Sequence, residues 1–171
     1  FRGLMAAIAY FFMPVALKRF GLANSDAGVV SFLLSAGYLA GYLLIYRQFD
    51  KIGAARTALW GAALQIAPFL LLLFSPSRTA YFAFYFIFSL GDILIAQGVP
   101  LGILQAVPST AIGSVTALRL VAMQASDALL SLGIGGVVVE NFALFAALYC
   151  VMAAAVACLS FIIFKKSQKE K

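Results

Sequence analysis

The sequence predicts an all-α membrane protein, built from six transmembrane helices in a single domain that covers residues 1–171. The first observation is composition: 64% of the residues are hydrophobic, 11% are charged and the mean hydropathy is +1.05. A soluble globular domain carries about a quarter charged residues, so this chain has too little polar surface to be one. The second observation is that basic residues stand at the ends of long apolar runs, which is typical of membrane topology and not of nucleic-acid binding.

Six apolar runs are predicted to cross the bilayer as helices, because ~30 Å of hydrocarbon needs about 20 helical residues. None of them alternates apolar and polar residues as a transmembrane strand does, and open sheet edges cannot be satisfied in lipid. The connections are short and rich in turn-forming or charged residues, so neighbouring helices are expected to be antiparallel. The predicted spans are 3–17, 27–46, 57–74, 81–103, 112–139 and 142–164, and a tail follows at 165–171.

The first span is short and is interrupted by Pro14. The chain begins at Phe1 and not at Met, so we expect that Phe1 is not the native start. A secretory signal peptide is the alternative for this segment, but a small-residue cleavage site is missing. The second span follows Asn-Ser-Asp at 24–26 and the fourth follows Ser-Pro-Ser at 75–77, and both triplets predict helix N-caps.

Glycines and aromatic residues predict how the spans pack. Gly37 and Gly41 in the second span have the small-xxx-small spacing that is typical of close helix contacts, and the fifth span has three more glycines at 133, 135 and 136. The fourth span opens on the run YFAFYFIF, which we interpret as helix packing and interface anchoring and not as a ligand cage.

The basic residues predict the orientation of the chain, because six spans place both of its ends on one side of the membrane. Nine Lys and Arg residues fall on the side of the termini and three fall on the opposite side. By the positive-inside rule, the termini and the tail are expected in the cytoplasm, at a plasma (inner) membrane. The nine are Arg2, Arg47, Lys51, Arg56, Arg119, Lys165, Lys166, Lys169 and Lys171, and the three are Lys18, Arg19 and Arg78.

The connection between the second and third spans gathers four charged residues in YRQFDKIGAAR, at 46–56. It contains the pattern D-K-x-G-x-x-R, formed by Asp50, Lys51, Gly53 and Arg56. An Asp in a tight loop can cap a helix N-terminus or pair with an Arg, and a Gly permits a backbone turn that is closed to residues with a Cβ. The alternative is that the basic residues only fix the topology and that the Asp offsets them in solvent.

This pattern, between the second and third of six spans, resembles the cytoplasmic signature loop of the major facilitator superfamily. The family loop has a Gly four residues before the Asp and two basic residues after the second Gly, where this chain has Tyr46 and Ala54-Ala55. Members carry two six-helix halves, so the resemblance implies that this chain is the C-terminal half and that its partner is an N-terminal half of the same polypeptide. It also implies that the third and sixth spans lie outside the transport cavity, and neither of them contains a charged residue.

Two carboxylates lie inside the predicted spans, where a charged group costs about 3 kcal/mol or more and marks a candidate functional site. Asp92 lies eleven residues into the fourth span, roughly 16 Å at helical rise, which is near the bilayer midplane. Asp127 lies fifteen residues into the fifth span, counted from the other side, and reaches a similar depth. Burial favours the protonated form of a carboxylate and a nearby Arg favours the ionised form, so we expect either Asp to bind and release protons.

Polar residues near each Asp follow helical spacing, so each set is expected to form one stripe along its helix. The stripes are Tyr85, Ser89 and Asp92 in the fourth span, and Gln124, Asp127 and Ser131 in the fifth. Two such stripes facing a shared cavity would make an aqueous path. Arg119 is expected to pair with either Asp, to reach the cytoplasmic interface, or to bind an anionic group of a substrate. The alternative is that these polar residues hold helices together and have no part in transport.

These residues predict half of a secondary active transporter that moves a small solute by alternating access, with proton-coupled efflux by antiport as the first expectation. Carboxylates and aromatic residues suit cationic or amphipathic solutes. The chain has no His, and Cys150 and Cys158 lie in one apolar run, so neither a metal site nor a cofactor is predicted. No nucleotide-binding G-x-x-x-x-G-K-[ST] loop occurs, and neither enzyme activity nor a nucleic-acid partner is predicted.

Two other classes of protein stay open. A six-span scaffold or accessory subunit would keep its function without either intramembrane carboxylate. An intramembrane protease would need the carboxylates of Asp92 and Asp127 to share a proton at about 3 Å, whereas a transport cavity tolerates a wider separation. The chain lacks the Ser–His pair and the HExxH motif that other hydrolases use.

Overall fold

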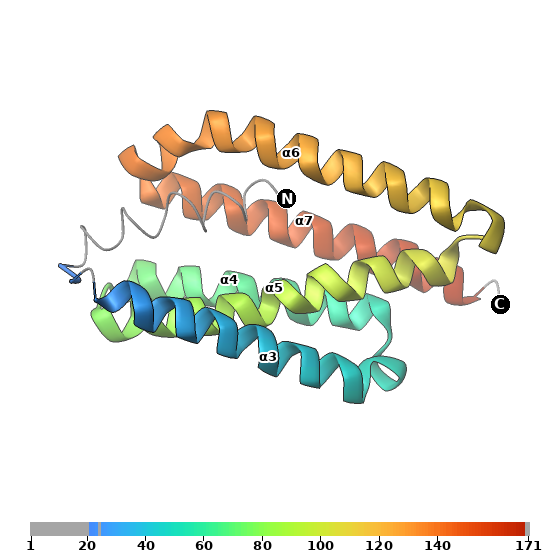
Figure 1. Cartoon of the computed structure of the whole chain (residues 1–171), viewed down its shortest axis with the longest axis horizontal. Helices are drawn as coiled ribbons and strands as arrows, with labels where there is room; N and C mark the ends of the chain where they lie inside the picture. The colour runs from blue at the N-terminus through green and yellow to red at the C-terminus, as the bar shows by residue number, and fades with distance from the viewer. Residues whose placement is uncertain (1–20, 24, 170–171) are drawn as a thin grey trace.

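The computed structural model describes the backbone of residues 21–23 and 25–169, and the side chains of these residues except those at 48–50, 106, 127, 129–140 and 163–169. The described residues form five α-helices and one 3₁₀ turn, with no strand among them (Figure 1). The helices are α3 (Asp26–Ile52), α4 (Ala54–Phe74), α5 (Arg78–Ala106), α6 (Ile112–Glu140) and α7 (Phe142–Lys169), and η2 (Ser109–Ala111) precedes α6.

The all-α prediction is confirmed for this part of the chain. Each of the five predicted runs from 27–46 to 142–164 lies within one helix, whereas the predicted span 3–17 lies outside the described residues, so six spans are not shown. Among the described residues, four helical segments are long and apolar enough to cross a bilayer, which fits a membrane protein, and α6, over the predicted span 112–139, is not one of them. They are Asp26–Arg47, Ala54–Phe74, Arg78–Gln105 and Phe142–Ile162.

The connection between α3 and α4 is shorter than the sequence predicts. α3 continues to Ile52, so Asp50 and Lys51 lie in its last turn and not in a loop. The reason is that residues 46–52 contain neither Gly nor Pro, and no residue before Gly53 ends the helix. Gly53 has φ +77° and ψ 159°, a conformation that side chains with a Cβ rarely adopt, and it makes the whole turn by itself.

Two helix starts were predicted from capping residues. Ser77 is the N-cap of α5, and its Oγ accepts a hydrogen bond from the Ala80 N–H at 3.2 Å, so this cap is confirmed. At the start of α3 the predicted triplet lies only partly within the described residues. Its Asp26 accepts a hydrogen bond from the Ala23 N–H at 3.0 Å and is itself the first residue of the helix.

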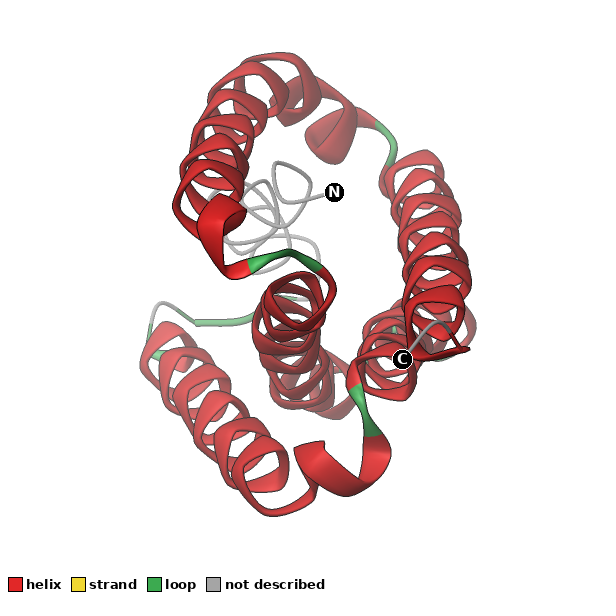
Figure 2. Ribbon diagram, turned by 90° about the vertical axis from the view of Figure 1, so that its right-hand side faces the viewer, coloured by secondary structure: helices red, strands yellow, loops and turns green. Residues whose placement is uncertain are grey.

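The helices pack around α5, which contacts α3 on one side and α4 on another, while α4 also packs against α7. α6 makes its main contacts with α7 and η2. Figure 1 shows α6 at one side of the molecule and α3 at the opposite side, and Figure 2 shows the same separation in a view turned by 90°. α3, α4, α5 and α7 therefore form the packed part of the structure, and α6 lies at its edge.

An aromatic core joins α4, α5 and α7. Phe69 of α4 is fully buried at its centre, with ring centroids 5.0 Å from Phe84 of α5 and 4.7 Å from Tyr149 of α7. The prediction that YFAFYFIF serves helix packing is confirmed, since four of its rings are at most 4% exposed. These are Tyr81, Phe84, Tyr85 and Phe88. Because lipid tails are as apolar as these rings, the contacts stabilise the bundle through dispersion and close packing.

Replacing Phe69 by Ala is expected to destabilise the bundle by about 2 kcal/mol, which is below the 3–5 kcal/mol of soluble cores because lipid solvates the separated helices. A lower thermal midpoint in detergent would measure the loss. Phe74→Ala is the matched control, because Phe74 is on the same helix and is 86% exposed. Equal midpoints for the two variants would contradict the assignment of Phe69 to the core.

Candidate functional site: a buried carboxylate between two helices

Asp92 is buried inside the helix bundle. It belongs to α5 and is 4% exposed. The Tyr38 hydroxyl of α3 donates a hydrogen bond to Asp92 Oδ2 at 2.7 Å. This places the carboxylate at the contact between α3 and α5 and gives it a polar partner from a helix 54 residues away in the chain. A hydrogen bond of this kind partly offsets the cost of a carboxylate away from water.

Two glycines bring α3 close enough for this contact. A Cβ at Gly37 would collide with Ser89 Oγ and with the Phe86 carbonyl oxygen of α5, and a Cβ at Gly41 would collide with the Ile93 side chain. The prediction of a close helix contact at Gly37 and Gly41 is therefore confirmed. Tyr38 directly follows Gly37 in the chain, so the close approach delivers its hydroxyl to α5.

A glycine of α5 has the same role toward α4. A Cβ at Gly91 would lie 2.7 Å from the Gly61 carbonyl oxygen and 2.9 Å from Gln65 Cγ. Asp92 directly follows Gly91, so it belongs to a part of α5 that packs closely against both α3 and α4. Gln65, which lies against Gly91, is itself fully buried and is a polar side chain in the span of α4.

Sequence reasoning missed the tyrosines of α3 that form hydrogen bonds with polar residues of α5. Besides the Tyr38 contact, Gln97 Nε2 of α5 donates to the Tyr42 hydroxyl at 3.3 Å. Tyr38 and Tyr42 are four residues apart and each directly follows a glycine, so they lie on one face of α3 beside the close contact. The sequence pattern G-Y-x-x-G-Y could therefore have predicted that these two tyrosines meet the neighbouring helix.

Tyr85 and Ser89, the other residues of the predicted stripe, are fully buried. Ser89 Oγ donates to the Phe86 carbonyl oxygen of its own helix at 3.0 Å. The Tyr85 ring packs against Tyr81 and Phe84, with centroids 5.1 and 5.3 Å apart. Both residues thus lie within packed helices, and Asp92 of the same stripe bonds to α3 through Tyr38.

α6 makes its main contacts with α7 and η2, and no contact between the two predicted stripes is described. On α6, Gln124 is exposed and Arg119 is half-buried. Asp127 is on the same helix, and its side chain lies outside the described residues. Contact between Asp92 and Asp127, which a protease dyad would need, is accordingly not described.

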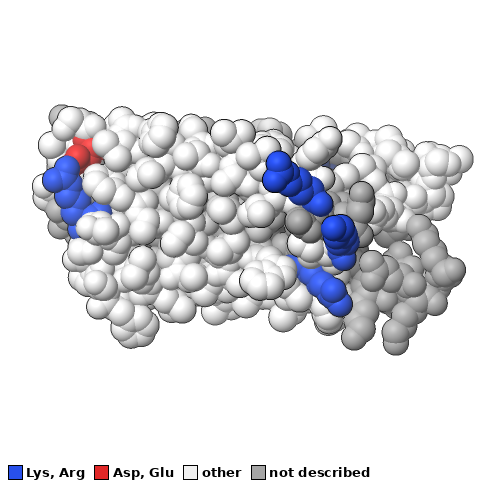
Figure 3. Space-filling view, turned by 90° about the horizontal axis from the view of Figure 1, so that it is seen from below, with Lys and Arg blue, Asp and Glu red and all other residues white. Residues whose placement is uncertain are grey.

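The predicted signature loop places its basic side chains on the surface. Lys51 and Arg56 are exposed, and the side chain of Asp50 lies outside the described residues. The N-cap residue of α4 is Gly53, and capping of α4 by the Asp50 side chain stays a prediction. Thr57 Oγ1 donates to the Gly53 carbonyl oxygen at 2.9 Å and steadies the turn. Figure 3 shows Lys and Arg side chains toward one end of the helices, and a basic side chain beside an acidic one at the other end.

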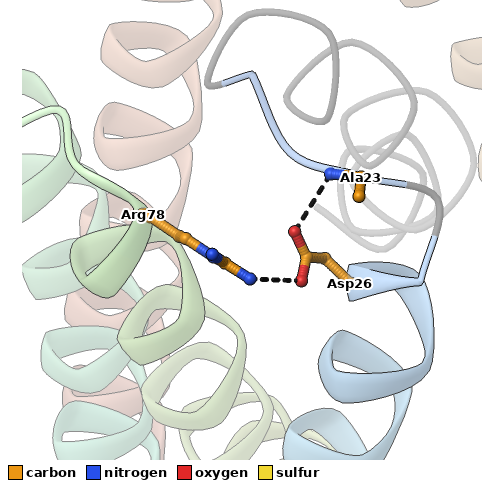
Figure 4. Close-up of polar contacts among 3 residues, drawn as sticks. All are labelled: Ala23, Asp26 and Arg78. Carbon is orange, nitrogen blue, oxygen red and sulfur yellow. Dashed lines mark hydrogen bonds and ion pairs between the residues drawn. The ribbon is translucent and has the colours of Figure 1, made fainter.

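That second pair is an ion pair between the starts of α3 and α5. Arg78 Nη2 donates to Asp26 Oδ1 at 2.6 Å, while Asp26 Oδ2 accepts from the Ala23 N–H (Figure 4). Asp26 is 5% exposed, and the guanidinium of Arg78 lies 5.5 Å from the centroid of the Phe82 ring. Polar contacts therefore join the parallel helices α3 and α5 at three levels, through Asp26–Arg78, Tyr38–Asp92 and Tyr42–Gln97.

No group of three or more His, Cys, Asp or Glu residues that could bind a metal ion occurs among the residues that the structure describes. Comparisons of the chain with models of protein families, with curated proteins and with solved structures found no match. The function is therefore argued from the geometry of Asp92 and its neighbours.

Proposed function

We propose that this chain is the C-terminal six-helix half of a secondary transporter of the major facilitator type, which exports a small solute in exchange for protons. The observation that carries the proposal is the buried carboxylate of Asp92. Asp92 is the middle residue of α5, a 29-residue helix whose apolar part is long enough to cross a bilayer. An ionisable group at that depth is expensive and is typical of proton relays and substrate sites.

The contact with Tyr38 gives protonation a structural consequence. A hydrogen bond from a hydroxyl to an ionised carboxylate is roughly twice as strong as one between neutral groups. Proton binding at Asp92 removes the charge and weakens the link between α3 and α5, and proton release restores it. In alternating access, this difference couples proton occupancy to the relative position of the two helices.

Two features of the packing support the assignment. α4 and α7, the third and sixth of the predicted spans, pack side by side, and the resemblance to the superfamily implies that these two lie away from the cavity. The glycines at the contacts of α5 with α3 and α4 leave smooth helix surfaces that can slide past each other. Solute is then expected to enter between this half and an N-terminal half of the same polypeptide.

A non-transporting scaffold or accessory subunit is the second candidate. The observation that favours it is the aromatic core around Phe69, together with the direct Tyr38–Asp92 bond, since both are also what a static bundle would use. In that case the carboxylate only joins two helices.

Accessibility from both sides of the membrane separates the two candidates without knowledge of the solute. Gln97→Cys is placed in the complete protein from which all other cysteines have been removed, and a membrane-impermeant thiol reagent is added from either side of sealed vesicles. Gln97 lies half-buried between α3 and α5. A transporter is expected to label from both sides, with proportions that depend on pH. Leu73→Cys, at a 40% exposed position on α4, is the lipid-facing control and is expected not to react.

Labelling of Gln97→Cys from one side alone, or at a rate independent of pH, would support the scaffold and contradict proton-coupled alternating access.

A further inference from the structure

A pocket lies between α3 and α4, on the side of their connection at Gly53. Its volume is about 210 Å³, larger than the ~150 Å³ apolar cavity that accommodates benzene in an engineered protein. Six of its seven lining residues are hydrophobic, and Thr57 is the other. The lining residues are Leu44, Ile45, Ile52, Thr57, Trp60, Leu64 and Leu94, and we refer to this pocket as the α3–α4 groove.

The α3–α4 groove opens to the surface that faces lipid. Leu44 and Trp60 on its two walls are 48% and 63% exposed, and both belong to segments that are apolar enough to span a bilayer. Leu94 of α5, which is 8% exposed, closes the inner side. A hydrocarbon chain of the bilayer can therefore reach the groove without crossing the protein.

Basic side chains surround the end of the groove near Gly53. On α3, Leu44, Arg47 and Lys51 follow i, i+3 and i+7 and share one face of the helix. On α4, Arg56 stands four residues before Trp60, on the face that Trp60 and Leu64 form. At the helical rise of 1.5 Å per residue, Arg47 and Lys51 lie about 4 and 10 Å along α3 from Leu44, and Arg56 lies about 12 Å along α4 from Leu64.

The start of α4 adds to the attraction for an anion. Its N-cap, Gly53, has no side chain, and the amide groups of the first helical turn carry partial positive charge. Asp50 belongs to the last turn of α3, so the residues at this end comprise three cations and one anion and have a net positive charge. Trp side chains such as Trp60 are enriched at the border between the hydrocarbon core and the headgroups of a bilayer.

We propose that the α3–α4 groove binds one anionic phospholipid of the bilayer, with an acyl chain between the two helices and the phosphate at Arg47, Lys51 and Arg56. The apolar walls suit an acyl chain, and the basic residues at the end near Gly53 suit an anionic headgroup. Clusters of basic residues beside membrane-spanning helices are a general means of recognising anionic lipid. The inference depends on the membrane location of the chain and not on the proposed transport activity.

Trp60 provides the test, because it is the only Trp of this chain. The full chain is placed in nanodiscs of phosphatidylcholine that contain a small fraction of either brominated phosphatidylglycerol or brominated phosphatidylcholine, and quenching of Trp60 is compared. The anionic lipid is expected to quench about fivefold more at an equal mole fraction, since each basic residue contributes a severalfold preference. The excess is expected to shrink at high salt.

Two pairs of variants locate the lipid. The triple variant Arg47→Gln, Lys51→Gln, Arg56→Gln is expected to abolish the excess, and Arg78→Gln, at the opposite end of the helices, is expected to keep it. Leu64→Phe narrows the groove and is expected to reduce quenching, whereas Leu70→Phe, at a 44% exposed position on the same helix, is not.

Equal quenching by both lipids in the unmodified chain would overturn the proposal, as would an excess that persists in the triple variant. If Leu64→Phe and Leu70→Phe behave alike, the lipid gathers at the surface without entering the groove, and the proposed site is wrong. Should the triple variant fail to fold, the salt dependence in the unmodified chain decides the role of the basic end, and an excess unaffected by salt rejects it.

Discussion

Replacing Gly37 by Leu is expected to separate α3 from α5 and to leave little folded protein. Even the first carbon of the new side chain would collide with the Phe86 carbonyl oxygen, which is backbone and cannot rotate aside. Overpacking of a well-packed contact costs about 1–3 kcal/mol, and we expect about 3 kcal/mol here because the helix itself must move. The yield of monodisperse protein in detergent and its thermal midpoint measure the effect.

Gly28 offers a control for the same substitution in the same helix, because a Cβ there has no atom within 4 Å. Gly28→Leu is expected to keep the yield and the midpoint of the unmodified chain, and Gly37→Ala to fall between the two. If Gly37→Leu were as stable as Gly28→Leu, the close contact of α3 with α5 would not exist as described, and the Tyr38–Asp92 bond that depends on it would fall as well.

Asp92→Asn is expected to abolish transport driven by a proton gradient while preserving the fold. The Asn side chain has nearly the same shape, and its amide oxygen still accepts the hydrogen bond from Tyr38, but it no longer binds and releases a proton. Solute flux in vesicles that carry the complete protein is expected to fall to background when a pH gradient is the only driving force. Exchange of labelled solute without a gradient is expected to continue.

The variant Tyr38→Phe distinguishes a role of Asp92 in proton coupling from a role that only joins α3 to α5. It removes the hydroxyl and keeps the carboxylate, so we expect a loss of about 1 kcal/mol of stability, in the range of hydrogen bonds between membrane helices, and retained coupling with a changed pH profile. A scaffold predicts that neither variant changes any flux. If Asp92→Asn retained full gradient-driven transport, the proton-coupling role of this residue would be wrong.

The helices themselves could be predicted from the sequence, because apolar runs of sufficient length have few alternatives in a bilayer. Gly37, Gly41 and the Ser77 cap were found for the same reason, since each acts through local backbone geometry. The end of α3 was misplaced, because charge was read as a sign of a loop, and Arg, Gln and Lys are good helix formers. Only Gly53 interrupts the helical backbone there.

The partners of the charged residues could not be predicted, because they depend on which helices become neighbours. Asp26 was expected in the N-cap cluster of α3, and its ion pair with Arg78, which is 52 residues away, was not predicted. For Asp92 the sequence suggested partners on the following span, and the hydrogen bond from Tyr38 of α3 was not predicted. Helical spacing gives the face on which a residue lies, and the fold decides what that face meets.

The connection at Gly53 has a mechanical consequence. With a single residue between Ile52 and Ala54, one pair of backbone dihedrals joins the end of α3 to the beginning of α4. Because this connection is one residue long, a tilt of either α3 or α4 must also move the adjoining end of the other helix. We therefore expect a displacement of α3 at its contact with Asp92 to move the start of α4, where Arg56 lies, as well.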